Sequence, residues 1–98
     1  MHEHYQIKEA IWPVLERAGF GIESENNQVD YFGSIRTIFV RDDKRVLLEW
    51  NGEQGFGRAA VWKSDKWEGL PTKVLEAKKS EFQEAIQRLV IDLRGHIL

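Results

Sequence analysis

The sequence predicts an α+β fold in which an N-terminal helix and a C-terminal helix pack on one face of an antiparallel sheet of four to five strands. Three runs rich in β-branched and aromatic residues lie between Ile35 and Lys63, and two clusters of turn formers separate them. An amphipathic helical pattern precedes these runs and another follows, and each needs an apolar surface to cover it. The chain has 98 residues, so we expect a single domain over residues 1–98.

The first predicted helix covers residues 4–18, where apolar residues recur with helical spacing from Ile7 to Ala18. Pro13 lacks a backbone N–H and crowds the preceding turn, so we expect a kink or a break near Trp12.

The segment after this helix is expected to be extended. Phe20 to Glu25 alternates apolar and polar residues, which indicates a short strand. Asn26-Asn27-Gln28 is a turn candidate, because asparagine tolerates positive φ. Val29 to Ser34 then re-enters the sheet or leads into it.

The meander begins with a hairpin around Asp42-Asp43-Lys44. A two-residue loop at Asp43-Lys44 would place Phe39 opposite Leu48 and divide the side chains between two faces. One face then holds Ile35, Thr37, Phe39, Val46, Leu48 and Trp50. The other holds the apolar residues Ile38, Val40 and Leu47, together with Arg36, Arg45 and Glu49. Both faces are partly apolar, so one is expected to meet the helices.

The rest of the sheet is less regular. Asn51-Gly52 is a strong turn signal before the third strand, which ends at Trp62. Ser64 to Thr72 is expected to be a loop that contains Trp67, and Val74-Leu75 is either an edge strand or the lead into the last helix.

The second predicted helix covers residues 81–94. Ser80 and Gln83 have the spacing of a capping box, and Gly95 is expected to end the helix. Its apolar face, which should fill the core, consists of Phe82, Ala85, Ile86, Leu89, Val90 and Leu93.

The net charge of −2 implies neither nucleic acid nor membrane as a partner. Residues 1–34 are the acidic part, with six acidic against two basic side chains, while residues 35–67 carry seven basic against five acidic ones. The chain has no cysteine, no apolar run that could span a membrane and no signal-peptide pattern at its start. We therefore expect a cytoplasmic, soluble protein.

No pattern indicates catalysis or a cofactor. His2 and His4 are the only candidate metal ligands, and we expect them to lie on a solvated terminus without the three or four ligands that zinc needs. The adjacent acids at Asp42-Asp43 belong to an exposed turn, and the Gly-x-Gly at 55–57 opens a strand rather than a helix. The expectation is a non-enzymatic protein with no metal and no cofactor.

Binding of single-stranded nucleic acid is an alternative, because arginines and lysines alternate with Trp50, Phe56 and Trp62 along the sheet. The acids that dilute this charge argue against it, and they are Asp42, Asp43, Glu49, Glu53 and Asp65.

Protein binding is the leading interpretation, since aromatic residues and arginine are enriched in interface hot spots. The partner-binding residues are expected to be Arg36, Ile38, Val40, Arg45, Leu47, Trp62 and Trp67. Two alternatives remain: this face is covered by residues 20–34 or 64–79, or it is the interface of a homodimer.

Two runs resemble a pattern of small bacterial stand-alone domains. They are Tyr31-Phe-Gly-Ser-Ile-Arg-Thr-Ile-Phe-Val40 and Val46-Leu-Leu-Glu-Trp-Asn-Gly-Glu-Gln-Gly55, with a Phe-Gly-Ser strand entry and a later strand that ends in Trp-Asn-Gly. Such domains include immunity proteins of polymorphic-toxin and contact-inhibition systems. The resemblance implies a protein that binds and blocks a cognate toxin, and the acidic residues 1–34 would suit a basic nuclease toxin.

Overall fold

The computed structural model describes residues 2–27 and 33–97, which form two α-helices, one 3-10 turn and six strands. In chain order these are α1 Glu3–Arg17, β1 Gly21–Asn27, β2 Ile35–Arg41, β3 Lys44–Asn51, β4 Phe56–Lys63, β5 Lys66–Gly69, β6 Val74–Leu75, the 3-10 turn Lys79–Glu81 and α2 Phe82–Ile97. The predicted α+β class with a helix at each end is confirmed. The expected turn residue Gln28 and the lead-in at 29–32 lie outside the described residues.

The sheet follows the order β1-β2-β3-β4-β5, and every pair of neighbours is antiparallel. β6 pairs with the first part of β4, while β5 pairs with its second part, so these two short strands share one edge. The sheet therefore contains six strands, one more than the upper limit of the prediction.

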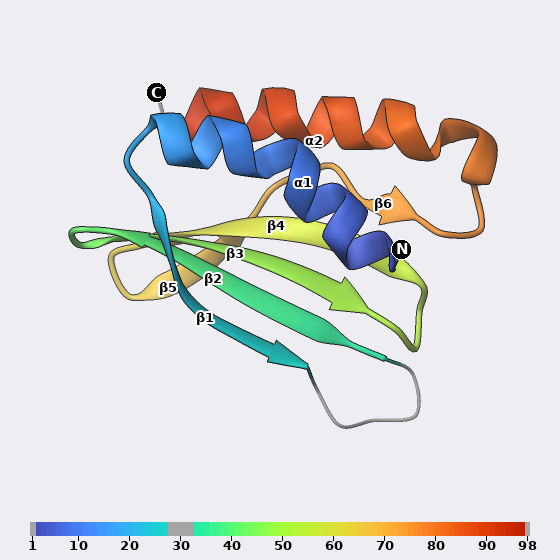
Figure 1. Cartoon of the computed structure of the whole chain (residues 1–98), viewed down its shortest axis with the longest axis horizontal. Helices are drawn as coiled ribbons and strands as arrows, with labels where there is room; N and C mark the ends of the chain where they lie inside the picture. Colours follow the sequence, from blue (N-terminus) through green and yellow to red (C-terminus); the bar gives the residue numbers. More distant parts are fainter. Residues whose placement is uncertain (1, 28–32, 98) are drawn as a thin grey trace.

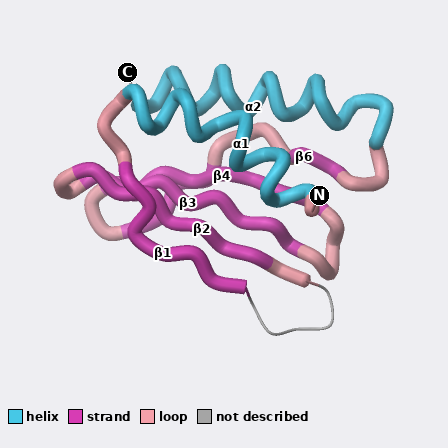
Figure 2. Tube along the Cα trace, in the orientation of Figure 1, coloured by secondary structure: helices cyan, strands magenta, loops and turns pink. Residues whose placement is uncertain are grey.

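Both helices lie on one face of this sheet, as predicted, and they run side by side in the same direction (Figure 1). Figure 2 shows the same two layers, with the helices on one side and the strands on the other. The α1 helix continues without a break through Pro13. Its ribbon changes direction partway along its length in Figure 1, which agrees with the predicted kink.

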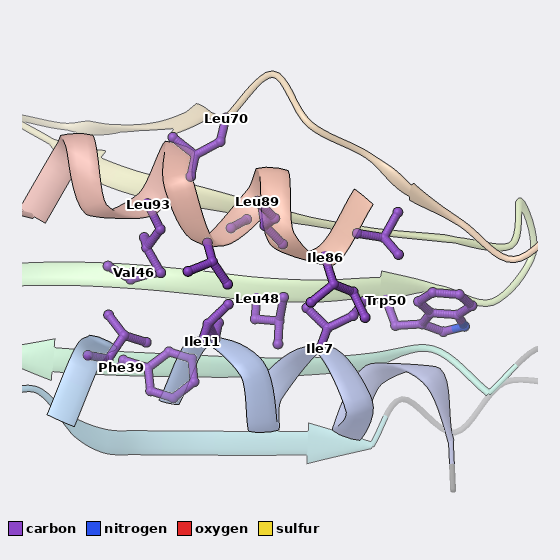
Figure 3. Close-up of a cluster of buried hydrophobic side chains, with 14 of the residues drawn as sticks. Ile7, Ile11, Phe39, Val46, Leu48, Trp50, Leu70, Ile86, Leu89 and Leu93 are labelled. Atoms are coloured by element: carbon purple, nitrogen blue, oxygen red, sulfur yellow. The ribbon is translucent and has the colours of Figure 1, made fainter. Parts of the chain in front are cut away.

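The hydrophobic core fills the space between the two layers (Figure 3). The side chains of α1 and α2 that face the sheet are fully or almost fully buried, and those of β2, β3 and β4 meet them from below. The central members are Ile7, Ile11, Leu15, Phe39, Val46, Leu48, Trp50, Ile86, Leu89 and Leu93. All six residues of the predicted apolar face of the second helix belong to this core.

The β2–β3 hairpin turns at Asp42-Asp43 rather than at Asp43-Lys44, and Asp42 has a φ of 55°. Phe39 consequently lies opposite Val46, not opposite Leu48. The predicted and observed registers differ by two residues, which is one full period of side-chain alternation. The predicted division of residues between the two faces is therefore correct.

Four local predictions were wrong. Ser64–Thr72 is not a loop throughout, because Lys66–Gly69 forms β5. Asn26 and Asn27 end β1 rather than forming a turn, and α2 continues past Gly95 to Ile97. Ser80 lies inside the 3-10 turn and not at the cap of a helix that begins at residue 81.

A candidate protein-binding face

The sheet face opposite the helices is called the open face below. Within residues 2–27 and 33–97, the remaining segments lie at the sheet edges or on the helix side. β1 and β5 extend the sheet, and the segment after β5 turns toward the helices, where Leu70 joins the core and Thr72 hydrogen-bonds Asp92 of α2. The alternative in which residues 20–34 or 64–79 cover this face is therefore wrong for the part of those segments that the structure describes.

Strand register arranges the open face in three rows that cross the sheet. The middle row contains Ser24, Ile38, Leu47, Ala60 and Gly69. The row toward one end contains Gly21, Val40 and Arg45, followed in the same register by Trp62 and Trp67. The row toward the other end contains Asn26, Arg36, Glu49 and Arg58. All seven residues predicted to bind a partner lie in these rows.

The middle row is the most apolar part of the open face. Leu47 is 8% exposed and Ala60 is 3% exposed, although neither belongs to the core between the sheet and the helices. Ile38 in this row and Val40 in the next row are half-buried. The accessible aliphatic area of the predicted site therefore comes from Ile38 and Val40 rather than from Leu47 and Ala60.

Trp62 and Trp67 form one end of this rim. They lie opposite each other across the β4–β5 pair, and their ring centroids are 5.2 Å apart in an edge-to-face arrangement. Both are half-buried, so part of each indole remains accessible. Edge-to-face packing holds the two rings in a defined orientation, which lowers the entropy lost when a partner contacts them.

The charged side chains on the open face are paired with each other. Glu49 accepts a hydrogen bond from Arg36 at 2.7 Å and lies 4.0 Å from Arg58. Arg45 donates to Glu23 at 2.8 Å. Glu23 lies where the β1–β2 register shifts, between Ile22 and Ser24, and this shift brings Glu25 opposite Thr37 on the helix side of the sheet. The shift was not visible in the sequence.

A second polar cluster, called the His4 network below, lies on the other side of the sheet beneath α1. His4 is fully buried, and its Nε2–H donates to the Thr37 hydroxyl at 2.8 Å. Thr37 in turn donates to Glu25 Oε2 at 2.7 Å, and Lys8 donates to the same oxygen at 2.6 Å. The expectation that His4 lies on a solvated terminus was wrong, because α1 begins at Glu3 and carries the ring into the interior.

Burial lowers the pKa of His4 to about 4, and the nearby charge of Glu25 only partly opposes this effect. Burial alone would raise the pKa of Glu25, but the hydrogen bonds from Lys8 and Thr37 outweigh it, so the pKa of this carboxyl lies below its ordinary value. The Thr37 hydroxyl, although placed between an imidazole and a carboxylate, is completely buried, so no substrate can reach it.

Among the residues that the structure describes, no three His, Cys, Asp or Glu side chains come together as metal ligands. Trp50, which was considered as a base-stacking residue, is 3% exposed and lies in the core. In the described part of the chain, neither helix has the length and apolar character needed to cross a membrane. The chain matches no family model, no curated protein and no solved structure.

Proposed function

We propose that this protein is a non-catalytic domain that binds another protein through the open face. The proposal rests on the arrangement of that face. An apolar row is flanked by a tryptophan pair on one side and by arginines on the other. Hot spots of protein interfaces combine these residue types around a dry centre. A flat sheet surface of this kind fits a protein surface better than a small ligand, which needs a concave pocket.

The size of the face constrains the partner. With strands about 4.8 Å apart, the five strands of the main path span about 19 Å, and the outer two rows are about 13 Å apart. The area that these two lengths enclose is well below the roughly 800 Å² that each side of a standard interface buries. The partner is therefore expected to extend past the three rows, onto the β1 edge or the β4–β5 hairpin.

The most concrete form of the proposal is an immunity-like inhibitor that binds a cognate toxin. Its support is the resemblance of the two runs around β2 and β3 to immunity domains. The charge argument for a basic toxin is weakened, because two of the acidic side chains in residues 1–34, Glu23 and Glu25, are each paired with a base of this chain. Apolar and aromatic contacts carry the proposed binding, and the remaining acids of α1 contribute only to steering.

The test uses two matched substitutions. Val40→Glu places a charge in the open face, and Ile91→Glu places the same charge on α2, where Ile91 is 66% exposed. Candidate partners are captured on the immobilised protein from a lysate of the source organism and from extracts that express the neighbouring open reading frames. Each captured protein is then titrated by calorimetry against both variants.

A specific partner is expected to bind the wild-type chain and Ile91→Glu with the same affinity, and to bind Val40→Glu at least tenfold more weakly. Burying the new charge should cost more than the 1.4 kcal/mol that corresponds to this factor. A partner that binds Val40→Glu as tightly as the wild type would contradict the assignment of the open face. Inhibition of a toxic partner by the wild-type chain, and not by Val40→Glu, would support the toxin reading.

A homodimer through the same face is the second candidate, and the mixture of both charge signs on the face favours it. A second copy could exchange the pairs of Glu49 with Arg36 and Arg58 across a two-fold axis. Sedimentation equilibrium separates the two candidates: a dimer that dissociates on Val40→Glu supports self-association, and a monomer at high concentration excludes it.

Binding of single-stranded oligonucleotide at low salt would support the remaining alternative, a nucleic-acid-binding domain.

A further inference from the structure

Two histidines hold the start of α1 on the sheet. His2 is the N-cap of the helix, and its Nδ1 accepts a hydrogen bond from the backbone N–H of His4 at 3.0 Å. The His2 ring also packs edge-to-face on Trp50, with 5.7 Å between the ring centroids. His4 lies two residues further along the chain, is completely buried, and is attached to β2 through Thr37.

The hydrogen bonds around these two rings leave one nitrogen of each ring, Nδ1, unprotonated. Thr37 donates its proton to Glu25, so its oxygen must accept from His4, which fixes the proton of His4 on Nε2. The Nδ1 of His4 is then unprotonated, and it is buried without a hydrogen-bond partner among the described residues. A proton on that nitrogen would create a buried donor with no acceptor and a buried charge. A proton on Nδ1 of His2 would abolish the N-cap, because the nitrogen could no longer accept.

We propose that His2 and His4 make the attachment of the first turns of α1 to the sheet sensitive to acid, so that neutral rings hold this segment and protonated rings release it. This acid sensitivity is independent of the proposed binding function, since the His4 network lies on the core side of the sheet.

The charged groups around His4 do not remove this sensitivity. From β1, Glu25 favours a protonated His4, but its carboxylate already accepts hydrogen bonds from Lys8 and Thr37. From α1, Lys8 and a protonated His2 both oppose the charge. Beside His2, Glu3 Oε2 lies 3.8 Å from Nδ1. From β2 and β3, the Thr37 hydroxyl contacts His4 and the Trp50 indole contacts His2.

The pH window follows from the direction of the shift. The pKa of His4 falls from 6.5 to about 4 on folding, so the unfolded or released segment binds a proton in this range that the folded segment does not. The attachment is therefore complete above pH 6.5 and weakens as the pH falls toward 4. The lowered pKa of Glu25 acts in the same direction, but only below the ordinary carboxyl value of 4.5, so the range from pH 6.5 to 4.5 isolates the histidine effect.

The test combines histidine titration by NMR with amide hydrogen exchange on the full chain. The ring of His4 is expected to titrate at least one pH unit below the ordinary histidine pKa of 6.5. After correction for intrinsic exchange, the amides in the first turns of α1 should exchange faster as the pH falls from 6.5 to 4.5. The exchange rate of these amides can rise by at most about tenfold per pH unit for each proton that is taken up. The amides of α2 around Leu89 should change less.

Two substitutions locate the effect. His4→Gln keeps a donor at the ε position but cannot be protonated, and it should abolish most of the pH dependence of α1 exchange. His96→Gln removes an exposed histidine and should leave the dependence unchanged. The proposal is overturned if His4 titrates at the ordinary histidine pKa of 6.5, or if α1 exchange in His4→Gln follows the wild-type pH profile. Should His4→Gln fail to fold, the titration of His4 in the wild-type chain decides the question alone.

Discussion

Replacing Gly57 with alanine is expected to destabilise the fold, because β4 passes so close to α1 that no side chain fits between them. An added Cβ would lie 2.6 Å from Cδ1 of Ile7 and 3.0 Å from Cε3 of Trp50. Favourable contacts between carbon atoms occur at about 3.5–4.0 Å. Ile7 is 0% exposed and Trp50 is 3% exposed, so neither can move aside without displacing other core residues.

The net effect is a difference between two terms. Alanine in place of glycine reduces the entropy of the unfolded chain, which stabilises a protein by about 0.4–1 kcal/mol where the native backbone is compatible. Overpacking of a core costs about 1–3 kcal/mol. We therefore expect the free energy of unfolding to fall by roughly 0.5–2 kcal/mol. The corresponding loss in Tm is about 4–8 °C for each kcal/mol in a domain of this size.

Urea unfolding followed by circular dichroism measures this change. Gly21→Ala is the matched control, because Gly21 also lies in a strand and an added Cβ there meets no atom within 4 Å. Ile7→Val removes the clashing Cδ1, so the cost of Gly57→Ala should be smaller in that background. A Gly57→Ala variant as stable as Gly21→Ala, or an undiminished cost in the Ile7→Val background, would refute the packing argument.

Three further predictions concern stability. Phe82→Asp should lower the free energy of unfolding by about 3–5 kcal/mol, because Phe82 is in the core. Gln83→Asp, at the exposed neighbouring position, should have little effect. If chemical denaturation gives both variants the same stability, the assignment of the buried face of α2 is wrong. Gly95→Ala should raise Tm in a calorimetric scan, since Gly95 lies inside α2 with open space around it and alanine favours a helix by about 0.5–1 kcal/mol; a lower Tm would contradict this. Between pH 6.5 and 4, the free energy of unfolding of the wild-type chain should fall by up to about 3 kcal/mol relative to that of His4→Gln, as the change in the pKa of His4 implies. Urea titrations measure this difference, and parallel pH profiles of the two proteins would contradict the role of His4.

The elements that the sequence predicted well are those whose signal is local and repeated. The apolar spacing from Phe82 to Leu93 identifies the buried face of α2 without any knowledge of the sheet. Alternation along β2 and β3 likewise assigns each residue to a face, and it does so even when the turn at Asp42-Asp43 is misplaced. Gly95 was misread because glycine also occurs inside a helix when packing of the preceding turns extends it.

The elements that the sequence did not reveal depend on tertiary contacts. β5 contains one large apolar residue, Trp67, and its pairing relies on a tight turn in which Ser64 adopts a φ of 60°. Burial of His4 requires that α1 begin at Glu3 and that Thr37 and Glu25 face it from neighbouring strands. Neither requirement produces a pattern in the local sequence.

The candidate site falls between these cases. Arg36, Ile38 and Val40 could be placed together because they alternate with core residues along β2, and the same holds for Arg45 and Leu47 along β3. Ala60 follows from the same alternation along β4. The pairing of Arg45 with Glu23 could not be inferred, since it joins β3 to β1, two strands that lie on either side of β2.

The strict alternation between the core and the open face has an evolutionary consequence. Along β2, β3 and the end of β4, each residue that faces the helices is followed by one that faces away. Selection can therefore act on Val40 or Trp62 while Phe39 and Val61, their neighbours in the chain, stay constrained by packing. Homologues of this chain should diverge with a period of two along these strands, because the core constrains only every second position.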